Sequence, residues 1–386
     1  RLVTYIDEAG RRVTTESAYL TPDVLKRPNL KVAIFSQVTK IIFDTTGGKK
    51  KAVGVEFARK KNGPRYRVRV KKEVVVAAGA IHSPHILLLS GIGPKDELDK
   101  HNIPLVHELP GVGKHLQDHP VVNTRISVKP GHSIQYIAAT KGLALFKMIG
   151  AFVKWGLTGG GPMTTNVTEV AAFIRSDDPK LFSKDKYDIK DVTSAPGAPD
   201  LELILVPIGF TAHGHGPVPS GELITMGAIL LRPESKGAVT LKSADPFEAP
   251  IIDPHYLESP NDVAILVRGL KALIKIAKTE PFASNVNQNS NPLLDHDLGS
   301  LSDDDLEKEV RKRVETLYHP TSTCRMAPLE EEGVVNPDLK VYGLENVRVV
   351  DASIFPSIVA GHTAAPTIAI GEKAADIIKA ALAAAV

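Results

Sequence analysis

Cysteine is nearly absent from this sequence, because Cys324 is the only one in 386 residues. A single cysteine excludes an internal disulfide and a metal site built on several thiolates. Cys324 follows His319 by five positions, which could suggest a thiol nucleophile, but Arg325 and Met326 come directly after it. We therefore interpret Cys324 as a small packing residue of the interior.

Long apolar runs and an excess of one charge sign are also absent. No run approaches the roughly 20 apolar residues of a membrane-spanning helix, so we expect no membrane span. The net charge is only +3, with basic and acidic residues mixed along the chain, which gives no sign of nucleic-acid binding. Aromatic residues make up 5% of the chain, too few to place the walls of a substrate pocket from the sequence.

The sequence predicts no metal site. His213 and His215 form a His-x-His pair, but no carboxylate cluster accompanies them, and a flexible loop is the better interpretation. The chain begins at Arg1 without an initiator methionine, so the lack of a targeting signal carries no information about compartment, and none is predicted.

The length suits two or three domains, and the composition changes near Pro120. Residues 1–119 contain β-rich stretches, and residues 120–315 are richer in glycine, proline and alternating strands. Residues 316–386 resemble residues 1–119 in sequence pattern. We predict two halves of one cofactor domain, with a second domain inserted between them. The fold class is then α/β plus α+β.

Local patterns in the outer segments predict several strands and two helices. The apolar run Glu73–Ala78 is typical of a strand buried on both faces of a parallel sheet. Ser83 and Pro84 predict the N-cap and first residue of a short helix that ends at Leu89. A β-meander is predicted from the strands Val32–Phe43, Ala52–Ala58 and Tyr66–Ala77. Near the C-terminus we predict a short buried strand, Val347–Asp351, and an alanine-rich helix, Thr363–Ala383.

The middle segment predicts an antiparallel sheet and two helices. An apolar stripe at helical spacing marks residues 261–278 as an amphipathic helix. Ser302 begins a second helix, with three aspartates in its first turn, that we expect to run to about Thr316. Because Pro320 disfavours helical geometry at the residue before it, we place His319 at the exit of that helix. The predicted strands are Leu201–Phe210, Leu223–Leu231 and Ala238–Lys242.

His319 and His362 are the most informative pair of residues in the chain. An imidazole exchanges a proton near neutral pH. Two imidazoles that face one point can take a proton from an alcohol and hold the alkoxide that forms. No amino-acid side chain accepts a hydride, so such a site needs a cofactor beside it.

The strings Gly79–Gly93 and Leu109–Pro120 precede the segments around His319 and His362. In this order the four segments resemble those of the glucose–methanol–choline (GMC) flavoprotein oxidoreductases. The string Gly79–Gly93 matches the second signature of that family, and Leu109–Pro120 resembles another family segment. The segments around His319 and His362 match the two C-terminal landmarks of the family. The resemblance extends from about Leu2 to Ala380, which makes coincidence a poor explanation.

The resemblance implies a flavin-binding α/β domain (1–119 and 316–386) and an inserted substrate-binding domain (120–315) built on an antiparallel sheet. It implies FAD as cofactor, His319 and His362 as catalytic residues and Tyr318 as an aromatic wall of the substrate pocket. Chemistry supports part of this independently, since the start of a helix at Thr363 favours negative charge on a reduced flavin. The implied cofactor-binding residues are Val38, Ala78, Gly79, Asp351, Ala352, Thr363 and Ala364.

Asp351 has a second interpretation. It follows a predicted buried strand, where its carboxylate could accept a hydrogen bond from a ribityl hydroxyl. The alternative is that it caps a helix or a turn.

The glycine fingerprint G-x-G-x-x-G of a dinucleotide-binding loop is absent. Gly91-Ile92-Gly93 and Gly111-Val112-Gly113 both continue with the wrong residues. This loop normally opens a βαβ unit of roughly 30 residues or more. We therefore expect the chain to be the C-terminal portion of such an enzyme, with an incomplete Rossmann-like domain. A preceding N-terminal segment or a second chain would carry the motif.

The sequence thus predicts FAD-dependent oxidation of an alcohol, with a histidine base and hydride transfer to flavin N5. Two alternatives remain open. One is a non-redox relative, a lyase or cyclase, that keeps FAD as a structural group. The other is a non-catalytic fragment that binds a small molecule or a partner chain.

Overall fold

The computed structural model describes residues 5–168, 170–182, 185–287, 291 and 293–384. The chain divides into two compact units, each assembled from three stretches of sequence. Unit 1 contains Arg1–Leu30, Pro120–Glu234 and Ser259–Leu317, and unit 2 contains Lys31–His119, Ser235–Glu258 and Tyr318–Val386.

This division differs from the predicted domains 1–119, 120–315 and 316–386 in two places. Residues 1–30 belong with the middle segment, and residues 235–258 belong with the outer segments. The predicted strand Ala238–Lys242 lies in this second stretch. As β11 (Ala238–Thr240) it pairs with β12 (Ile251–Asp253) in unit 2, so its assignment to the antiparallel sheet of the second domain was wrong.

In unit 2 the predicted meander forms from three antiparallel strands, β1 (Gln37–Asp44), β2 (Lys51–Ala58) and β3 (Tyr66–Arg69). The first strand begins five residues later than expected. Phe35 adopts φ +51°, which interrupts an extended chain, and its side chain is 85% exposed. Alternation of buried and partly buried residues along β2 fits a strand with one covered face.

A separate parallel pair joins β4 (Val74–Val76) to β14 (Val347–Val349), residues far apart in the sequence. All of β14 is buried as predicted, including Arg348, whose Nε donates to the carboxylate of Glu73 at 2.8 Å. The prediction that Glu73–Ala78 is buried on both faces was wrong, because Val75 is 42% exposed and β14 is the one strand that pairs with β4 in the described chain. Because β4 and β14 are parallel, their carboxyl ends lie at the same edge of the pair.

The helix after β4 begins earlier than predicted. α3 spans Gly79–Leu89, so Pro84 lies inside the helix and not at its first residue. A proline there leaves the carbonyl of Ala80, four residues back, without its usual amide donor. The hydroxyl of Thr323 donates to that carbonyl at 2.5 Å, which explains why the helix continues through the proline.

The other elements of unit 2 are short, apart from the C-terminal helix. Its buried core is a single cluster that includes Leu87, Leu88, Cys324, Val347 and Val349. These elements are α4 (Lys95–Lys100), β5 (Ile92–Gly93), β6 (His107–Glu108), α8 (Ala364–Ala383) and the 3₁₀ helices η1 (Thr46–Gly48), η7 (Leu329–Glu331) and η8 (Ala352–Ile354).

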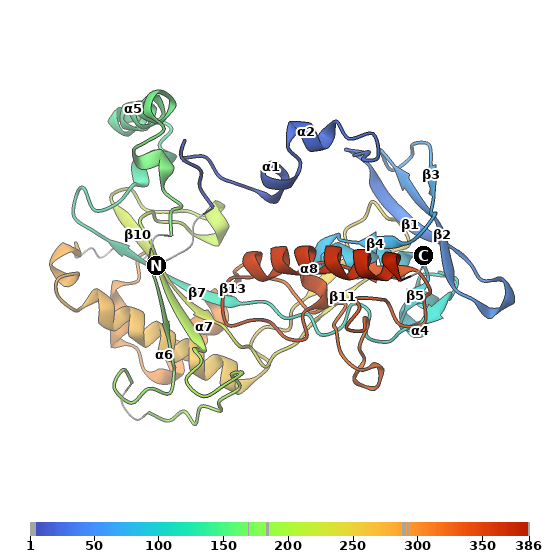
Figure 1. The fold of residues 1–386 in the computed structure, drawn as a ribbon. Coiled ribbons are helices and arrows are strands. Elements are labelled where there is room, and N and C mark those ends of the chain that lie inside the picture. Colours follow the sequence, from blue (N-terminus) through green and yellow to red (C-terminus); the bar gives the residue numbers. More distant parts are fainter. Residues whose placement is uncertain (1–4, 169, 183–184, 288–290, 292, 385–386) are drawn as a thin grey trace. The chain divides into compact units, whose positions relative to one another are not determined.

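Unit 1 is built on a five-stranded antiparallel sheet in the order β13-β7-β10-β9-β8. The amphipathic helix predicted at 261–278 is confirmed as α6 (Pro260–Ala277), and it packs along this sheet against β7, β9 and β10 (Figure 1). The strands are β7 (Pro120–Ser127), β8 (Val170–Ile174), β9 (Leu201–Val206), β10 (Leu223–Leu230) and β13 (Glu315–Thr316).

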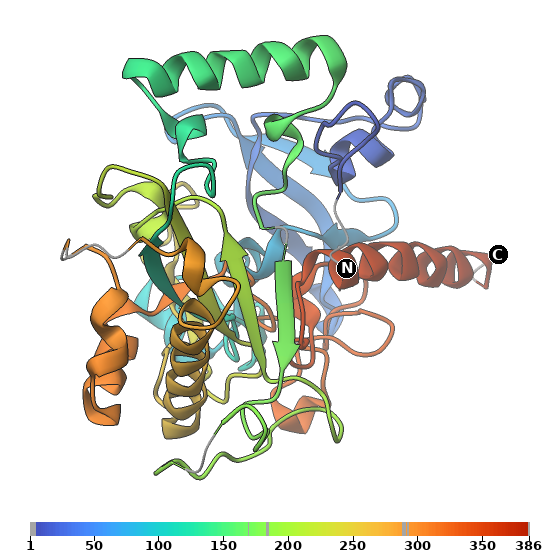
Figure 2. The same ribbon diagram turned by 90° about the vertical axis from the view of Figure 1, so that its left-hand side faces the viewer.

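The remaining helices of unit 1 include one that the sequence analysis missed. That helix, α5 (Gly142–Thr158), stands away from the strands of the sheet (Figure 2). The helix predicted from Ser302 is α7 (Asp303–Arg313), capped by the Ser302 hydroxyl, and it ends three residues early because β13 follows it. The others are α1 (Thr15–Tyr19), α2 (Pro22–Leu25), η2 (Gln135–Ala138), η3 (Pro162–Thr164), η4 (Ala212–Gly214), η5 (Ala283–Asn285) and η6 (His296–Ser300).

No described helix combines the length and apolar character needed to cross a bilayer.

The packing of α6 on the sheet depends on a glycine. A Cβ added at Gly269 would lie 2.8 Å from the Cβ of Ala228 and 2.9 Å from a methyl group of Leu201. Both neighbours are fully buried, so neither can move aside cheaply. Gly150 in α5 is the opposite case, since a Cβ there meets nothing within 4 Å.

We expect Gly269→Leu to lower the free energy of unfolding by about 1–3 kcal/mol or more, because it overpacks the helix–sheet contact. Gly150→Ala is the matched control and should raise the free energy of unfolding by about 0.5–1 kcal/mol. Urea unfolding followed by circular dichroism measures both changes. Equal effects at the two positions would contradict the packing described for Gly269.

Candidate active site

The two histidines singled out in the sequence lie together in unit 2. The ring centroids of His319 and His362 are 4.8 Å apart, and the ring planes meet at 68°. His319 is half-buried and His362 is exposed. The predicted convergence of the two imidazoles is therefore present in the structure.

Local backbone geometry brings the two rings to this position. His319 follows Tyr318, whose φ of +60° turns the chain, so the residue lies in a loop beyond β13 and not directly at the exit of α7. His362 lies two residues before the first residue of α8. Amides of Ser322, Cys324 and Met326 donate to carbonyls of the 352–354 segment, which fixes the His319 loop beside the strand end that leads to His362.

A third histidine completes the cluster. His119 is fully buried, and its Nδ1 lies 2.9 Å from Nδ1 of His319. The two ring planes are nearly perpendicular, with centroids 5.1 Å apart. Nε2 of His119 lies 3.0 Å from the carbonyl oxygen of Val359, three residues before His362. His119 thus contacts both catalytic segments that the sequence predicts.

Asp118 holds the same loop through its carboxylate. Oδ1 accepts the backbone amides of His119 and His319, both at 2.8 Å, and Oδ2 accepts the hydroxyl of Tyr256 at 2.5 Å. The side chain is 6% exposed. A buried carboxylate with several donors is a stable anchor, because hydrogen bonds to a charged acceptor are stronger than those between neutral groups.

Gln117 forms a further link between the segments. Its backbone exchanges both hydrogen bonds with Thr321, just after His319. Its side-chain Oε1 accepts the amide of Ile358 at 3.1 Å. The three residues Gln117–His119, here called the anchor segment, therefore hold the loop of His319 and the chain that leads to His362.

Burial controls the protonation of His319. The loss of solvent and the neighbouring rings of His119 and His362 lower the pKa of His319 to about 3, with Asp118 opposing this in part. A histidine with this pKa is neutral at physiological pH. It can accept a proton there, which an imidazolium cannot.

Four predicted cofactor-binding residues meet at the carboxyl edge of β4 and β14. Ala78 and Gly79 follow β4, while Asp351 and Ala352 follow β14. Oδ2 of Asp351 accepts the amide of Gly79 at 2.9 Å and the hydroxyl of Ser83, and Oδ1 accepts the amide of Ser353 at 2.8 Å. The capping interpretation of Asp351 thus describes its observed contacts, which join α3 to η8.

This edge also fits a nucleotide cofactor sterically. A Cβ added at Gly79 meets nothing within 4 Å, and Gly79 has φ +79°, a conformation that favours glycine. Ala78 is exposed, so the backbone of this edge can be approached closely. Ligands of open α/β sheets bind at the carboxyl ends of parallel strands, as this edge offers.

The other predicted binding residues occupy separate elements. Thr363 is buried and precedes α8, and Ala364, its first residue, is exposed. Val38 is in β1 and pairs with Phe57 of β2. Tyr318 is adjacent to His319 in sequence, with a side chain that is 66% exposed. Val38 thus belongs to the β1-β2-β3 meander and not to the carboxyl edge of β4 and β14.

Other candidate groups have structural roles. Cys324 is fully buried in the core of unit 2, and burial raises the pKa of its thiol, so the packing interpretation is confirmed. His213 has φ +53° in the short η4 turn. Within the described ranges no group of three or more His, Cys, Asp or Glu side chains is arranged to hold a metal ion.

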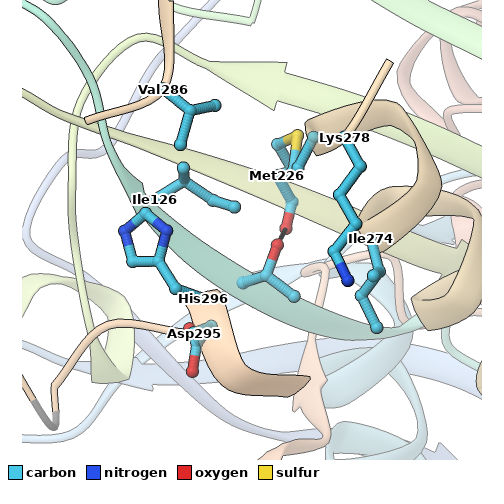
Figure 3. Close-up of a pocket in the computed structure, with 9 residues that line it drawn as sticks. Ile126, Met226, Ile274, Lys278, Val286, Asp295 and His296 are labelled. Carbon is cyan, nitrogen blue, oxygen red and sulfur yellow. Dashed lines mark hydrogen bonds between the residues drawn. The ribbon is translucent and has the colours of Figure 1, made fainter. Parts of the chain in front are cut away.

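Unit 1 contains a cavity that is smaller than typical ligand pockets. Its volume is about 90 Å³, against roughly 300–1,000 Å³ for ligand pockets (Figure 3). His296 at its wall accepts the amide of Ser127 at 3.2 Å, and burial lowers its pKa. Its lining is Thr124, Ile126, Met226, Ile274, Ala277, Lys278, Val286, Asp295 and His296.

Sequence reasoning selected the segment that contains Gln117–His119 but assigned no role to these residues. A signal was present, since three polar side chains in a row follow Leu116 and precede the apolar start of β7. Consecutive polar residues that fold into the interior require partners. Which partners they find depends on contacts across some 200 positions, and periodicity does not report such contacts.

Comparison with known proteins gives consistent matches. Family models described as GMC oxidoreductase match residues 3–121 and 233–371. A dehydrogenase, str4, of Strobilurus tenacellus is 40% identical over 393 residues, which cover 96% of this chain and 62% of that protein. An alcohol dehydrogenase [acceptor] of Pseudomonas putida is 35% identical over 96% of this chain and 61% of its own length.

Solved structures agree with this match. The structure of formate oxidase superposes with a TM-score of 0.82 at 30% identity, over 92% of this chain and 62% of that one. A formate oxidase of Aspergillus oryzae with a TM-score of 0.79 was studied for modification of its FAD. FAD is the cofactor of this fold, and the carboxyl edge described above suits it.

These findings correct one expectation from the sequence. The N-terminal family model matches from residue 3, so the prediction that the N-terminal family segment is lacking was wrong in that form. The comparisons likewise give no support to an incomplete cofactor domain or to a second chain that carries the glycine motif. The chain spans about three fifths of the length of the relatives it matches, and G-x-G-x-x-G does not occur in it.

Two family models, shared order of motifs and a shared fold lead to one assignment: this chain belongs to the GMC oxidoreductase family.

Proposed function

We propose that this chain carries the proton-transfer site of an FAD-dependent enzyme that oxidises an alcohol. One observation carries the proposal, namely the imidazole of His319 beside that of His362, with ring centroids 4.8 Å apart. Burial lowers the pKa of His319, which favours its neutral form. Relatives named as alcohol dehydrogenase and choline dehydrogenase make a primary or secondary alcohol the substrate class to test.

The proposed roles follow from the chemistry of the groups. His319 takes the proton of the substrate hydroxyl as general base. His362, exposed and across from it, donates a hydrogen bond to the oxygen as negative charge develops there. When bound, FAD supplies the acceptor for the hydride of the carbinol carbon, so the alcohol becomes an aldehyde or ketone.

We further propose which residues hold the cofactor. Ala78 and Gly79 would offer backbone at the carboxyl edge of β4, and Ala352 would do so beyond β14. Thr363 and Ala364 would present the start of α8, whose partial positive charge stabilises an anionic ring by up to about 2 kcal/mol when partly buried. Val38 would contact the adenine end, and Asp351 would act by holding the edge together. Tyr318 would flank the substrate.

Replacement of the base is the first test. We expect His319→Ala to lower the rate of anaerobic flavin reduction by an alcohol by about 10²–10⁴-fold, because general-base catalysis contributes that much. Stopped-flow absorbance of the flavin-loaded protein measures the rate, and the ratio of flavin to protein absorbance shows whether FAD stays bound. Reduction at the normal rate would remove the role given to His319, whereas absence of reduction in the unaltered protein would favour a non-redox relative.

The pH dependence of flavin reduction gives a second test. Because the pKa of His319 is lowered to about 3, the base is already unprotonated at pH 5 and stays so at higher pH. We therefore expect no loss of rate between pH 8 and pH 5 from this group. A base with the ordinary histidine pKa of about 6.5 would lose most of its rate over the same interval. An acid limb near that value, absent in His319→Gln, would contradict the lowered pKa.

The anchoring of the loop gives a third test. Tyr256→Phe removes one donor from the carboxylate of Asp118, and we expect a loss of about 1 kcal/mol in the free energy of unfolding. Tyr66→Phe is the control, since that ring is 46% exposed and stacks on Phe57. Thermal unfolding compares them, and equal stability of both variants would show that the Tyr256 contact contributes nothing.

A further inference from the structure

We propose that His119 is a positioning residue that decides which ring nitrogen of His319 carries the proton. This inference rests on the proposed function, because the tautomer matters only if His319 acts as a base. His119 lies in the anchor segment Gln117–His119 and not among the residues that would meet the substrate.

Nε2 of His119 carries a hydrogen. This atom is 3.0 Å from the carbonyl oxygen of Val359. A carbonyl oxygen only accepts hydrogen bonds, so Nε2 of His119 must carry a hydrogen. In a neutral imidazole the other nitrogen, Nδ1, then has a lone pair and no hydrogen.

The rings of His119 and His319 share one hydrogen bond through their Nδ1 atoms. Nδ1 of His119 is 2.9 Å from Nδ1 of His319, a hydrogen-bond distance that requires one proton between the two atoms. Because Nδ1 of His119 is the acceptor, Nδ1 of His319 is the donor. His319 is therefore the Nδ1–H tautomer, and its Nε2 has the lone pair that takes the substrate proton.

A charged His119 would reverse this assignment, and the surroundings oppose it. His119 is fully buried, and burial penalises an imidazolium. Of the groups around His319, the rings of His119 and His362 lower its pKa and the carboxylate of Asp118 raises it, but burial is the largest cause and the net direction is downward. A neutral His119 keeps its hydrogen bonds to Val359 and His319 without an additional buried charge.

The positioning role has a chemical consequence. An imidazole without such a partner exchanges between its two neutral tautomers, and only one of them is a base at Nε2. A hydrogen bond to Nδ1 selects that tautomer and holds the ring angle at the same time. The same logic applies wherever a neighbouring acceptor orients a catalytic histidine.

A pair of variants at one position separates this role from simple packing. In His119→Asn the side-chain oxygen takes the place of Nδ1 and still accepts from His319, whereas His119→Leu has similar volume and no acceptor. We expect flavin reduction in His119→Leu to slow on the order of tenfold, and His119→Asn to recover to within about threefold of the unaltered protein. His215→Leu, which removes an exposed histidine whose backbone (φ −92°) suits leucine, is the control and should change nothing.

A second readout does not depend on turnover. Long-range ¹H–¹⁵N correlation of histidine-labelled protein reports which ring nitrogen is protonated, and His319 is assigned by comparison with His319→Gln. We expect one Nδ1–H form for His319 in the unaltered protein and in His119→Asn. In His119→Leu the signals should move toward a mixture of both forms.

The outcomes distinguish this inference from the proposed function. If alcohols reduce the flavin and His319→Ala prevents this, but His119→Leu has the normal rate and the normal tautomer, only the inference on His119 is overturned. Equal losses in His119→Asn and His119→Leu, with an unchanged tautomer, would make His119 a packing residue and also overturn it. Absence of reduction by alcohols would overturn the proposed function, while the ¹⁵N spectrum would still decide the tautomer.

Discussion

The hydrogen bonds of the anchor segment Gln117–His119 are the constraint on which the candidate site depends. Asp118 holds the amide of His319, Gln117 binds Thr321 and Ile358, and His119 contacts the His319 ring and the Val359 carbonyl. These contacts join stretches of chain separated by about two hundred residues or more. Backbone bonds to the 352–354 segment also hold the His319 loop, but such bonds do not orient an imidazole.

The electrostatic character of the site follows from the same contacts. Three imidazoles lie close together, and burial makes each additional positive charge costly. The pKa of His319 falls for this reason, and a neutral base is the result. The carboxylate of Asp118 contributes most by fixing the backbone, since its oxygens accept amides and the hydroxyl of Tyr256. One group of buried polar contacts thus determines both the position of the His319 loop and the acid–base behaviour of its imidazole.

Periodicity in the sequence predicted much of the fold. The apolar stripe of α6, the strands β9 and β10 and the buried strand β14 follow directly from it. Errors arose where a distant residue decides the local structure. Asp351 caps α3 at Gly79, and Thr323 supplies the donor that lets Pro84 lie inside that helix, so the Ser-Pro signal marked no helix start.

In the candidate site, too, local motifs could be predicted from the sequence and contacts between distant residues could not. The motifs around His319 and His362 were visible in the sequence because each is a local string with a family resemblance. The role of His119 was not visible, because its ring contacts Val359 and His319 and no spacing rule connects these residues. Strand pairing has a similar limit, since β11 pairs with β12 in unit 2 although its sequence resembles the strands of the unit 1 sheet.

The central claim is that His319 and His362 meet at one substrate oxygen. A crystal structure of the flavin-loaded protein with a bound alcohol that resists oxidation tests this claim most directly. The account predicts the alcohol oxygen within hydrogen-bond reach, roughly 2.6–3.2 Å, of Nε2 of His319 and of the His362 ring. An alcohol oxygen bound to other side chains, with either imidazole turned away from it, would contradict the account.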